Sequence, residues 1–169
     1  MKHIDSFWGN IFHMNRMKDL LSILKNIPLF YNLKTIELVK FSRILHQRNF
    51  FQNEFIFHEK EPGAGMYIVK SGTVKIFLKG NDGQEHELAR LEKGDFFGEM
   101  ALIDESPRSA SAIALEDTEL LGFFRADLIN LMDRDPILSS KILMHLAIVL
   151  AQRLRQTNLD LKHIQYNVE

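Results

Sequence analysis

The feature that most constrains this chain is a long series of short apolar segments, from Ser42 to Phe124, separated by turn residues. Branched and aromatic residues dominate each segment, and turn-forming residues interrupt them at intervals of about eight to twelve positions. Segments of this length and spacing are typical of antiparallel strands joined by tight turns. The sequence therefore predicts a mainly β domain with flanking helices, built as an antiparallel jelly-roll (double-stranded β-helix) barrel.

Eight strands are expected in this region, and one of them shows a clear alternation. Val74, Ile76 and Leu78 are predicted to face one side of the sheet, while Lys75 and Lys79 face the other. The expected strands are Arg43–Arg48, Phe55–His58, Gly65–Lys70, Thr73–Lys79, Gln84–Leu91, Asp95–Phe97, Ser109–Ala114 and Thr118–Phe124.

Helical periodicity precedes the strands. Apolar residues spaced three and four apart predict a helix that Asn15 caps and that ends near Lys25, and the segment Lys34–Lys40 is expected to be a helical connector. Residues 1–13 carry an aromatic cluster outside any obvious core: Phe7, Trp8, Ile11 and Phe12. Two interpretations stay open for this cluster, a helix packed on its own domain and a docking surface for a partner chain.

Helical periodicity also follows the strands. Ala126–Met132 predicts a short helix, and Asp135 followed by Pro136 predicts the start of a long helix that reaches about His163. The expected organisation has three parts: residues 1–27 as an N-terminal helical segment, 28–125 as the β-roll, and 126–169 as C-terminal hinge and capping helices.

The long C-terminal helix carries a heptad pattern. Its members follow alternating steps of three and four positions: Ala147, Leu150, Leu154, Thr157, Leu161, Ile164 and Val168. One interpretation is a helix that lies along its own barrel. These seven residues form an apolar seam in which Thr157 is the only polar member. Such a seam favours the other interpretation, a parallel two-stranded contact with a second copy of the chain, and so predicts a homodimer.

Composition narrows the possible partners. The formal net charge is −1, so the chain has no overall basic field for nucleic acid, and direct DNA binding is not expected. The absence of cysteine excludes disulfides, Cys-based zinc sites and thiol catalysis. The longest uninterrupted apolar run, Leu146–Ala151, is far shorter than a membrane span. A cytoplasmic protein without a membrane segment is therefore expected.

The stretch Phe97–Ala112, FGEMALIDESPRSASA, carries the chemistry. Gly98 allows close approach of a ligand to the backbone, and the short helical turn after it offers free N–H groups to an anion. Arg108 adds a fork of donors that matches phosphate oxygens, and Ser109 adds a hydroxyl. Because the carboxylate of Glu99 would repel a phosphate, it is expected to accept hydrogen bonds from sugar hydroxyls. The residues alone also allow a simpler alternative, a Glu99–Arg108 salt bridge that closes the loop.

This stretch resembles the phosphate-binding cassette of the cyclic nucleotide-binding domain family. The family pattern is F-G-E-(L/M)-A-L, a variable gap, and P-R-(A/S)-A-(S/T), and Phe97–Ser111 matches it at every fixed place. The resemblance extends from about Pro28 to the last helix and includes four glycines and the segment 67–69 before one of them. The glycines are Gly63, Gly72, Gly83 and Gly94.

The resemblance implies a role for each matching residue. Glu99 would bind the ribose 2′-hydroxyl, and Arg108 would pair with the cyclic phosphate. The other implied contacts are Ser109 and the loop residues Gly98, Met100, Ala101 and Ala110 around the phosphate, and Ile76, Leu88 and Ala89 on the barrel wall. A departure from the pattern of a simple phosphate site is Asp104-Glu105, which places two negative charges near the cassette.

The last helix resembles the dimerisation helix of the catabolite activator protein group within this family. The matching segment is Arg153–Asn158, in which Thr157 and Asn158 would contact the base, one of them from the dimer mate, with Arg153 beside them. In that group a helix-turn-helix follows, whereas this sequence ends at Glu169. The expectation is a stand-alone sensor that signals through its C-terminal helices to an unknown protein partner.

Cyclic AMP is the expected ligand, and three alternatives are weighed against it. Ser109 is intermediate between the residues that favour cyclic AMP and cyclic GMP in the family, so a cyclic GMP sensor stays open. A ligand-free interaction module of the same fold is disfavoured because Glu99 and Arg108 are intact. A metal enzyme is disfavoured because the seven histidines form no His-x-His or His-Glu-x-x-His pattern, so no metal, cofactor or catalytic residue is expected.

Overall fold

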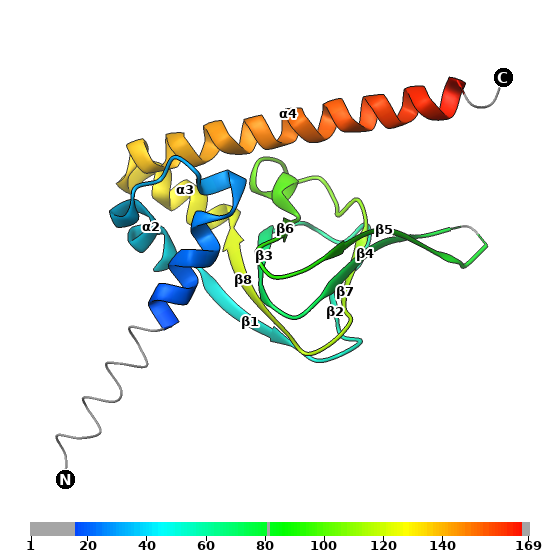
Figure 1. Cartoon of the computed structure of the whole chain (residues 1–169), viewed down its shortest axis with the longest axis horizontal. Helices are drawn as coiled ribbons and strands as arrows, with labels where there is room; N and C mark the ends of the chain where they lie inside the picture. Colours follow the sequence, from blue (N-terminus) through cyan, green and yellow to red (C-terminus); the bar gives the residue numbers. More distant parts are fainter. Residues whose placement is uncertain (1–15, 81, 167–169) are drawn as a thin grey trace, which may run out of the picture.

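Two four-stranded antiparallel sheets form the body of the molecule, and helices lie along one side of it (Figure 1). The computed structural model describes residues 16–80 and 82–166, with side chains to residue 163. Strands of one sheet run in the order β1-β8-β3-β6 and those of the other in the order β2-β7-β4-β5. The predicted jelly roll is confirmed. The strands are β1 (His46–Phe50), β2 (Phe55–Phe57), β3 (Gly65–Ser71), β4 (Val74–Lys79), β5 (Glu85–Leu91), β6 (Phe96–Phe97), β7 (Ser111–Ala114) and β8 (Thr118–Phe124).

All eight predicted strands are present, but several details are corrected: β1 ends at Phe50 and not at Arg48, and β7 begins at Ser111 and not at Ser109. The first strand begins at His46 and not at Arg43, because α2 (Thr35–Ser42) extends to Ser42 and Arg43 forms its C-cap. The predicted alternation in β4 is wrong beyond Ile76. The pairing of β4 with β5 shifts register between Ile76 and Phe77, so that Phe77 is buried and Leu78 is only partly buried.

The helices follow the predicted order. The first described helix covers residues 16–25 and is followed by η1 (Pro28–Phe30), and after β8 come α3 (Arg125–Arg134) and α4 (Pro136–Tyr166). Asp135 caps α4 as predicted, since its carboxylate accepts a hydrogen bond from the Leu138 N–H at 3.2 Å. The predicted cap Asn15 and the aromatic cluster of residues 7–12 lie outside the described residues.

Two apolar clusters hold these elements together. The larger cluster lies between the helices and the β1-β8-β3-β6 sheet, where the ring of Phe41 packs 4.5 Å from that of Phe30 and 4.9 Å from that of Phe123. The smaller cluster lies between the two sheets, with Val69 and Leu120 on one side and Val74 on the other. Because the helices are anchored on one sheet, the second sheet is left free to form the wall of a ligand site.

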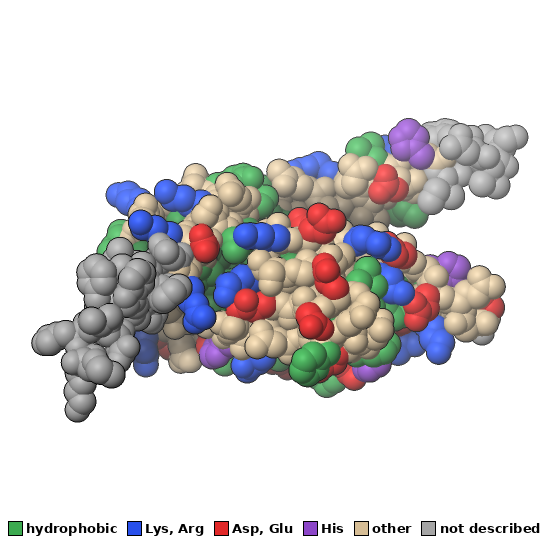
Figure 2. Space-filling model, turned by 60° about the horizontal axis from the view of Figure 1, so that its bottom comes forward, with side chains coloured by type: hydrophobic (Ala, Val, Ile, Leu, Met, Phe, Trp, Pro, Cys, Tyr) green, Lys and Arg blue, Asp and Glu red, His purple; other side chains and the backbone are tan. Residues whose placement is uncertain are grey.

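The long helix α4 has two parts with different surroundings. In the first part Leu138, Ile142 and Leu146 are fully buried in the larger cluster. From Gln152 to His163 every described residue is classed as exposed, and α4 extends past the helical side of the molecule and over the roll (Figures 1 and 2). By length and composition alone this helix is apolar enough to cross a membrane, but its first half already uses its apolar face in the core.

Candidate functional site

A cavity of about 590 Å³ lies between the β2-β7-β4-β5 sheet, the short helix η2 (Glu99–Leu102) and α4. Its volume is that of a typical small-molecule site. Most of its wall is apolar, and its ionisable side chains are Glu99, Arg108 and Arg153. The lining residues are Phe57, Ile76, Leu88, Ala89, Leu91, Phe96, Phe97, Gly98, Glu99, Met100, Arg108, Ser109, Ala110, Arg153 and Gln156.

Gly98 sets the geometry of the loop that enters this cavity. Its φ of +74° lies in the left-handed region, which an L side chain adopts at a cost. A Cβ at this position would lie 2.6 Å from Nη1 of Arg108, so a side chain would displace the guanidinium. The predicted helical turn begins directly after it at Glu99, as expected.

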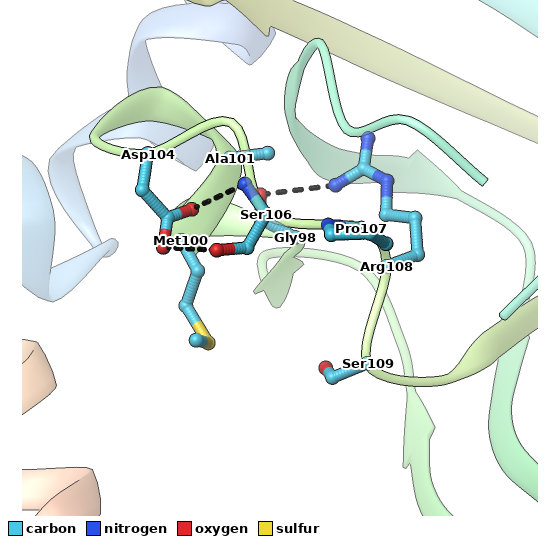
Figure 3. Close-up of a pocket in the computed structure, with 8 residues that line it drawn as sticks. All are labelled: Gly98, Met100, Ala101, Asp104, Ser106, Pro107, Arg108 and Ser109. Carbon is cyan, nitrogen blue, oxygen red and sulfur yellow. Dashed lines mark hydrogen bonds between the residues drawn. The ribbon is translucent and has the colours of Figure 1, made fainter. Parts of the chain in front are cut away.

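Backbone pairing fixes the second half of the loop. The N–H of Arg108 donates to the carbonyl of Glu61 at 2.8 Å, and its carbonyl accepts from the N–H of Lys60 at 2.8 Å. Ser106 donates from its N–H and its hydroxyl to the Asp104 carboxylate, at 3.3 and 2.9 Å (Figure 3). The backbone hydrogen bonds hold the segment that carries Arg108 in place. The hydrogen bonds from Ser106 pair the Asp104 carboxylate within the loop.

Arg108 is buried, and 8 % of the residue's surface is exposed. Nη1 donates to the Gly98 carbonyl at 3.2 Å, Nη2 donates to the Gly65 carbonyl at 2.8 Å, and the guanidinium carbon lies 4.1 Å from the centre of the Phe57 ring (Figure 3 shows the Gly98 bond). Nε is buried and has no partner among the described residues. Burial lowers the pKa of the guanidinium, against the opposing effect of Tyr67 and Glu99. The guanidinium of Arg108 is therefore a buried cation that can still donate a hydrogen bond to an anionic ligand.

Glu99 does not pair with Arg108, so the alternative of a Glu99–Arg108 salt bridge is wrong among the residues described here. Its carboxylate, nearly fully buried, accepts a hydrogen bond from Nη1 of Arg153 at 2.6 Å. Arg153 belongs to α4, and its guanidinium also lies 5.1 Å from the centre of the Phe96 ring. The cassette and the C-terminal helix are thus joined by one ion pair inside the cavity.

The two acidic residues of the loop have separate surroundings. Asp104 lines a smaller adjoining cavity of about 40 Å³, together with Gly98, Met100, Ala101 and Arg108 (Figure 3). Glu105 is exposed and pairs with Arg125, at the start of α3, at 2.5 Å. Only one of the two charges therefore faces the cassette.

The structure brings together most of the residues predicted for the site. Ten of them line the larger cavity, and Ala101 lines the smaller one beside it. The ten are Gly98, Glu99, Met100, Arg108, Ser109, Ala110, Ile76, Leu88, Ala89 and Arg153.

Two predicted residues lie outside the cavity of a single chain, and five residues that were not predicted for the site line it: Phe57, Leu91, Phe96, Phe97 and Gln156. Thr157 and Asn158 are exposed and absent from the cavity wall, and the Thr157 hydroxyl donates to the carbonyl of Arg153 at 3.0 Å. Gln156 lines the cavity instead. Its spacing of three residues from Arg153, which puts both on one helix face, is the signal that could have indicated it. A base contact shared between two chains stays a prediction.

A jelly roll in which a glycine-led turn, a buried arginine and a buried glutamate converge on one cavity defines the cyclic nucleotide-binding class of regulatory domains. The family model for the "Cyclic nucleotide-binding domain" matches residues 47–135. The chain belongs to the cyclic nucleotide-binding domain family.

Three relatives show how far the similarity extends. The "Cyclic AMP receptor protein" of Thermus thermophilus is 41% identical over 143 residues, which cover 85% of this chain and 64% of the relative. The "CRP-like cAMP-activated global transcriptional regulator" of Mycobacterium tuberculosis is 32% identical over 139 residues, 82% of this chain and 60% of the relative. The solved N-terminal domain of a transcriptional regulator from Streptomyces coelicolor A3(2) has a TM-score of 0.72 at 30% identity and covers 80% of this chain and 94% of that one.

These relatives are regulators, and no enzyme family is indicated. The chain spans about three fifths of the length of the two curated relatives, 64% and 60%. Family membership therefore establishes the class of this domain. The activity of a whole protein that contains it is proposed below.

Proposed function

We propose that this chain is a cytoplasmic sensor of a cyclic nucleotide, with cyclic AMP as its ligand and a change in the position of α4 as its output to a partner protein. The observation that carries the proposal is the buried guanidinium of Arg108. It makes no ion pair among the described residues, its Nε lacks a partner, and it lines the same cavity as the buried carboxylate of Glu99. A cation and an acceptor in one cavity suit a ligand with a phosphate and a hydroxyl.

The signalling step follows from the pairing of Glu99. A ribose 2′-hydroxyl that donates to this carboxylate must share it with Arg153 or displace Arg153 from it. Phosphate capture by Arg108 and Ser109 draws the loop toward the ligand, and α3 and α4 follow. A ligand shifts this equilibrium only by its difference in affinity for the two positions of the helix. We also propose the functional division into residues 1–27, 28–125 and 126–169.

The exposed seam of α4 supports the proposal of a homodimer. Ala147, Leu154, Thr157 and Leu161 are all exposed and share one face of the helix. Leu150, a fifth member of the predicted seam, packs partly against the larger core cluster, and the side chains of Ile164 and Val168 lie outside the described residues. In this proposal the second copy covers the seam, and of Thr157 and Asn158 one contacts the base from its own chain and the other from the dimer mate.

Isothermal titration calorimetry with cyclic AMP and cyclic GMP tests the ligand. In Arg108→Ala, which removes one side of a buried charge pair with the phosphate, the expected loss is about 2–5 kcal/mol, or roughly 30- to several-thousand-fold in Kd. The matched control is Arg155→Ala, an exposed arginine of α4 outside the cavity, which should bind as the wild type does. The proposal is wrong if the wild type binds neither nucleotide at millimolar concentration, or if Arg108→Ala keeps its affinity. The first result would favour a ligand-free interaction module.

A further inference from the structure

The wall that α4 contributes to the cavity consists of two side chains, Arg153 and Gln156. Arg153 is committed to Glu99. Gln156 lies three residues further, or about 4.5 Å along the helix axis, and on the same helix face. It is the polar side chain of this cavity that neither the cassette nor the ion pair uses.

The position of Gln156 matches the position of the base. This step rests on the proposed function, in which Arg108 binds the phosphate and Glu99 binds the ribose 2′-hydroxyl. The base is attached to C1′, next to C2′ and on the opposite side of the ribose from the cyclic phosphate, so it extends past Glu99. Outside the cassette, the cavity is lined by six apolar side chains, by Arg153 and by Gln156; the six are Phe57, Ile76, Leu88, Ala89, Leu91 and Phe96.

Asp160 orients the Gln156 side chain. Nε2 of Gln156 donates to Oδ1 of Asp160 at 2.9 Å, one helical turn further on. A carboxylate accepts and does not donate, so it selects the amide orientation that turns the nitrogen toward it. The carbonyl oxygen Oε1 is then the end of the amide available to a ligand.

Adenine and guanine differ at the 6-position in whether they can donate a hydrogen bond to the amide oxygen of Gln156. Adenine carries an amino group there, which donates, whereas guanine carries a carbonyl, which accepts. The amide oxygen of Gln156 can accept from the 6-amino group of adenine and cannot hydrogen-bond to the 6-carbonyl of guanine.

We propose that Gln156, oriented by Asp160, is the residue within one chain that recognises the 6-position of the purine and selects adenine over guanine. Gln156 is the specificity-determining residue, and Asp160 is a positioning residue that acts through it. This role is separate from the predicted contacts of Thr157 and Asn158, which do not line the cavity of one chain.

The test uses ligands that differ at the 6-position. Cyclic IMP carries a carbonyl in place of the amino group of cyclic AMP, together with a proton on N1, and lacks the 2-amino group of guanine, so it tests the 6-position edge without the 2-position. Kd values for both are measured by calorimetry on the wild type, Gln156→Leu, Gln156→Met and Asp160→Ala. The control is Gln152→Leu, an exposed glutamine of α4 that does not line the cavity. Circular dichroism melts confirm that each variant is folded.

The wild type should bind cyclic AMP about tenfold more tightly than cyclic IMP, and Gln156→Leu and Gln156→Met should lose about 5- to 10-fold in cyclic AMP affinity, within the range of one hydrogen bond. Both should bind the two ligands within about twofold of each other. In Asp160→Ala the freed amide can rotate and donate to a carbonyl, so cyclic IMP affinity should rise while cyclic AMP affinity stays within about twofold. Gln152→Leu should keep the wild-type ratio.

Three results would overturn the inference, and they can be told apart from failure of the proposed function. If both Gln156 variants keep the wild-type ratio, the 6-position is recognised elsewhere, although cyclic AMP binding still stands. If Asp160→Ala keeps the ratio, Asp160 does not position the amide. If the wild type binds no cyclic nucleotide, the proposed function and this inference fail together.

Discussion

The ion pair between Glu99 and Arg153 allows a quantitative prediction about the ligand-free chain. The two partners are unequally buried, since the side chain of Glu99 is 4% exposed and that of Arg153 is 49% exposed. In Arg153→Met the apolar part of the side chain can still cover the ring of Phe96, so the main loss is the charge-assisted hydrogen bond to Glu99. A buried carboxylate is then left without the cation that accompanies it.

The expected size of this effect follows from the burial. A hydrogen bond to a charged group contributes about 1.5–3 kcal/mol to stability. Because Arg153 is half exposed and its charge is screened by water, the expected loss is discounted to about 1–2 kcal/mol. For a chain of this size, each kcal/mol lowers Tm by about 2–4 °C, so Tm should fall by about 2–8 °C.

A double-mutant cycle separates the pair from its surroundings. Urea unfolding is measured on the wild type, Arg153→Met, Glu99→Gln and the double variant, all without nucleotide, and the expected coupling energy is about 1 kcal/mol. Arg155→Met is the control, because Arg155 is an exposed arginine on the same helix that forms no ion pair among the described residues. Additive single effects, or an Arg153→Met variant as stable as the control, would show that the pair does not stabilise the ligand-free chain.

The remaining predictions concern the loop, the helix contacts and the seam. In Gly98→Ala the added Cβ would lie 2.6 Å from the guanidinium of Arg108, so calorimetry should show cyclic AMP binding as weak as in Arg108→Ala. Because the φ of Gly98 is positive, thermal melts should also show a loss of about 1–2 kcal/mol of stability. Lys141 holds the pKa of Glu37 below its usual value through a 2.6 Å hydrogen bond, so this stabilisation is present above the unfolded pKa of about 4.3 and is lost as pH falls through the lower folded value. Urea unfolding from about pH 6 to pH 3 should therefore show a shallower decline in Lys141→Met than in the wild type, and equal declines would contradict the assignment. Leu154→Glu should reduce a dimer to a monomer in analytical ultracentrifugation at micromolar concentration, and a wild type that is already monomeric would refute the seam.

The parts of the site that are local in sequence were predictable from it. Gly98, Glu99 and Arg108 lie within one short stretch, and their roles depend on backbone conformation and residue type, which the sequence contains. Some strand boundaries were predictable for the same reason, with Thr118–Phe124 found at the predicted residues, whereas the start of β1 was not, because α2 extends to Ser42. The break in β4 after Ile76 was not, because a bulge depends on the register of the neighbouring strand.

The contribution of α4 depended on how the helix lies over the roll. Glu99 and Arg153 are 54 residues apart, so their pairing requires the packing of α4 on the larger core cluster. That packing also sets the rotation of the helix, and successive residues differ by about 100° around it. Gln156 and Thr157 lie on opposite sides of Arg153 around the helix, about 60° and 40° away, and the cavity lies on the side of Gln156. The family resemblance compared residue types along a helix and contained no information about this rotation.

The proposed dual use of Glu99, which pairs with Arg153 and would bind the ribose, limits how strongly the ion pair alone can drive a signal. If the ribose takes the place of Arg153 on this carboxylate, the helix loses a contact of about 1–2 kcal/mol, which changes the ratio of its two positions by roughly 5- to 30-fold. A shift from 1:99 to 99:1 requires about 5.5 kcal/mol. The remaining free energy must come from contacts that differ between the two helix positions, and the proposal contains two sources, the base contact of Gln156 and the covering of the α4 seam by a second chain. Dimerisation and nucleotide binding should therefore be thermodynamically coupled in this protein, each strengthening the other by the same factor.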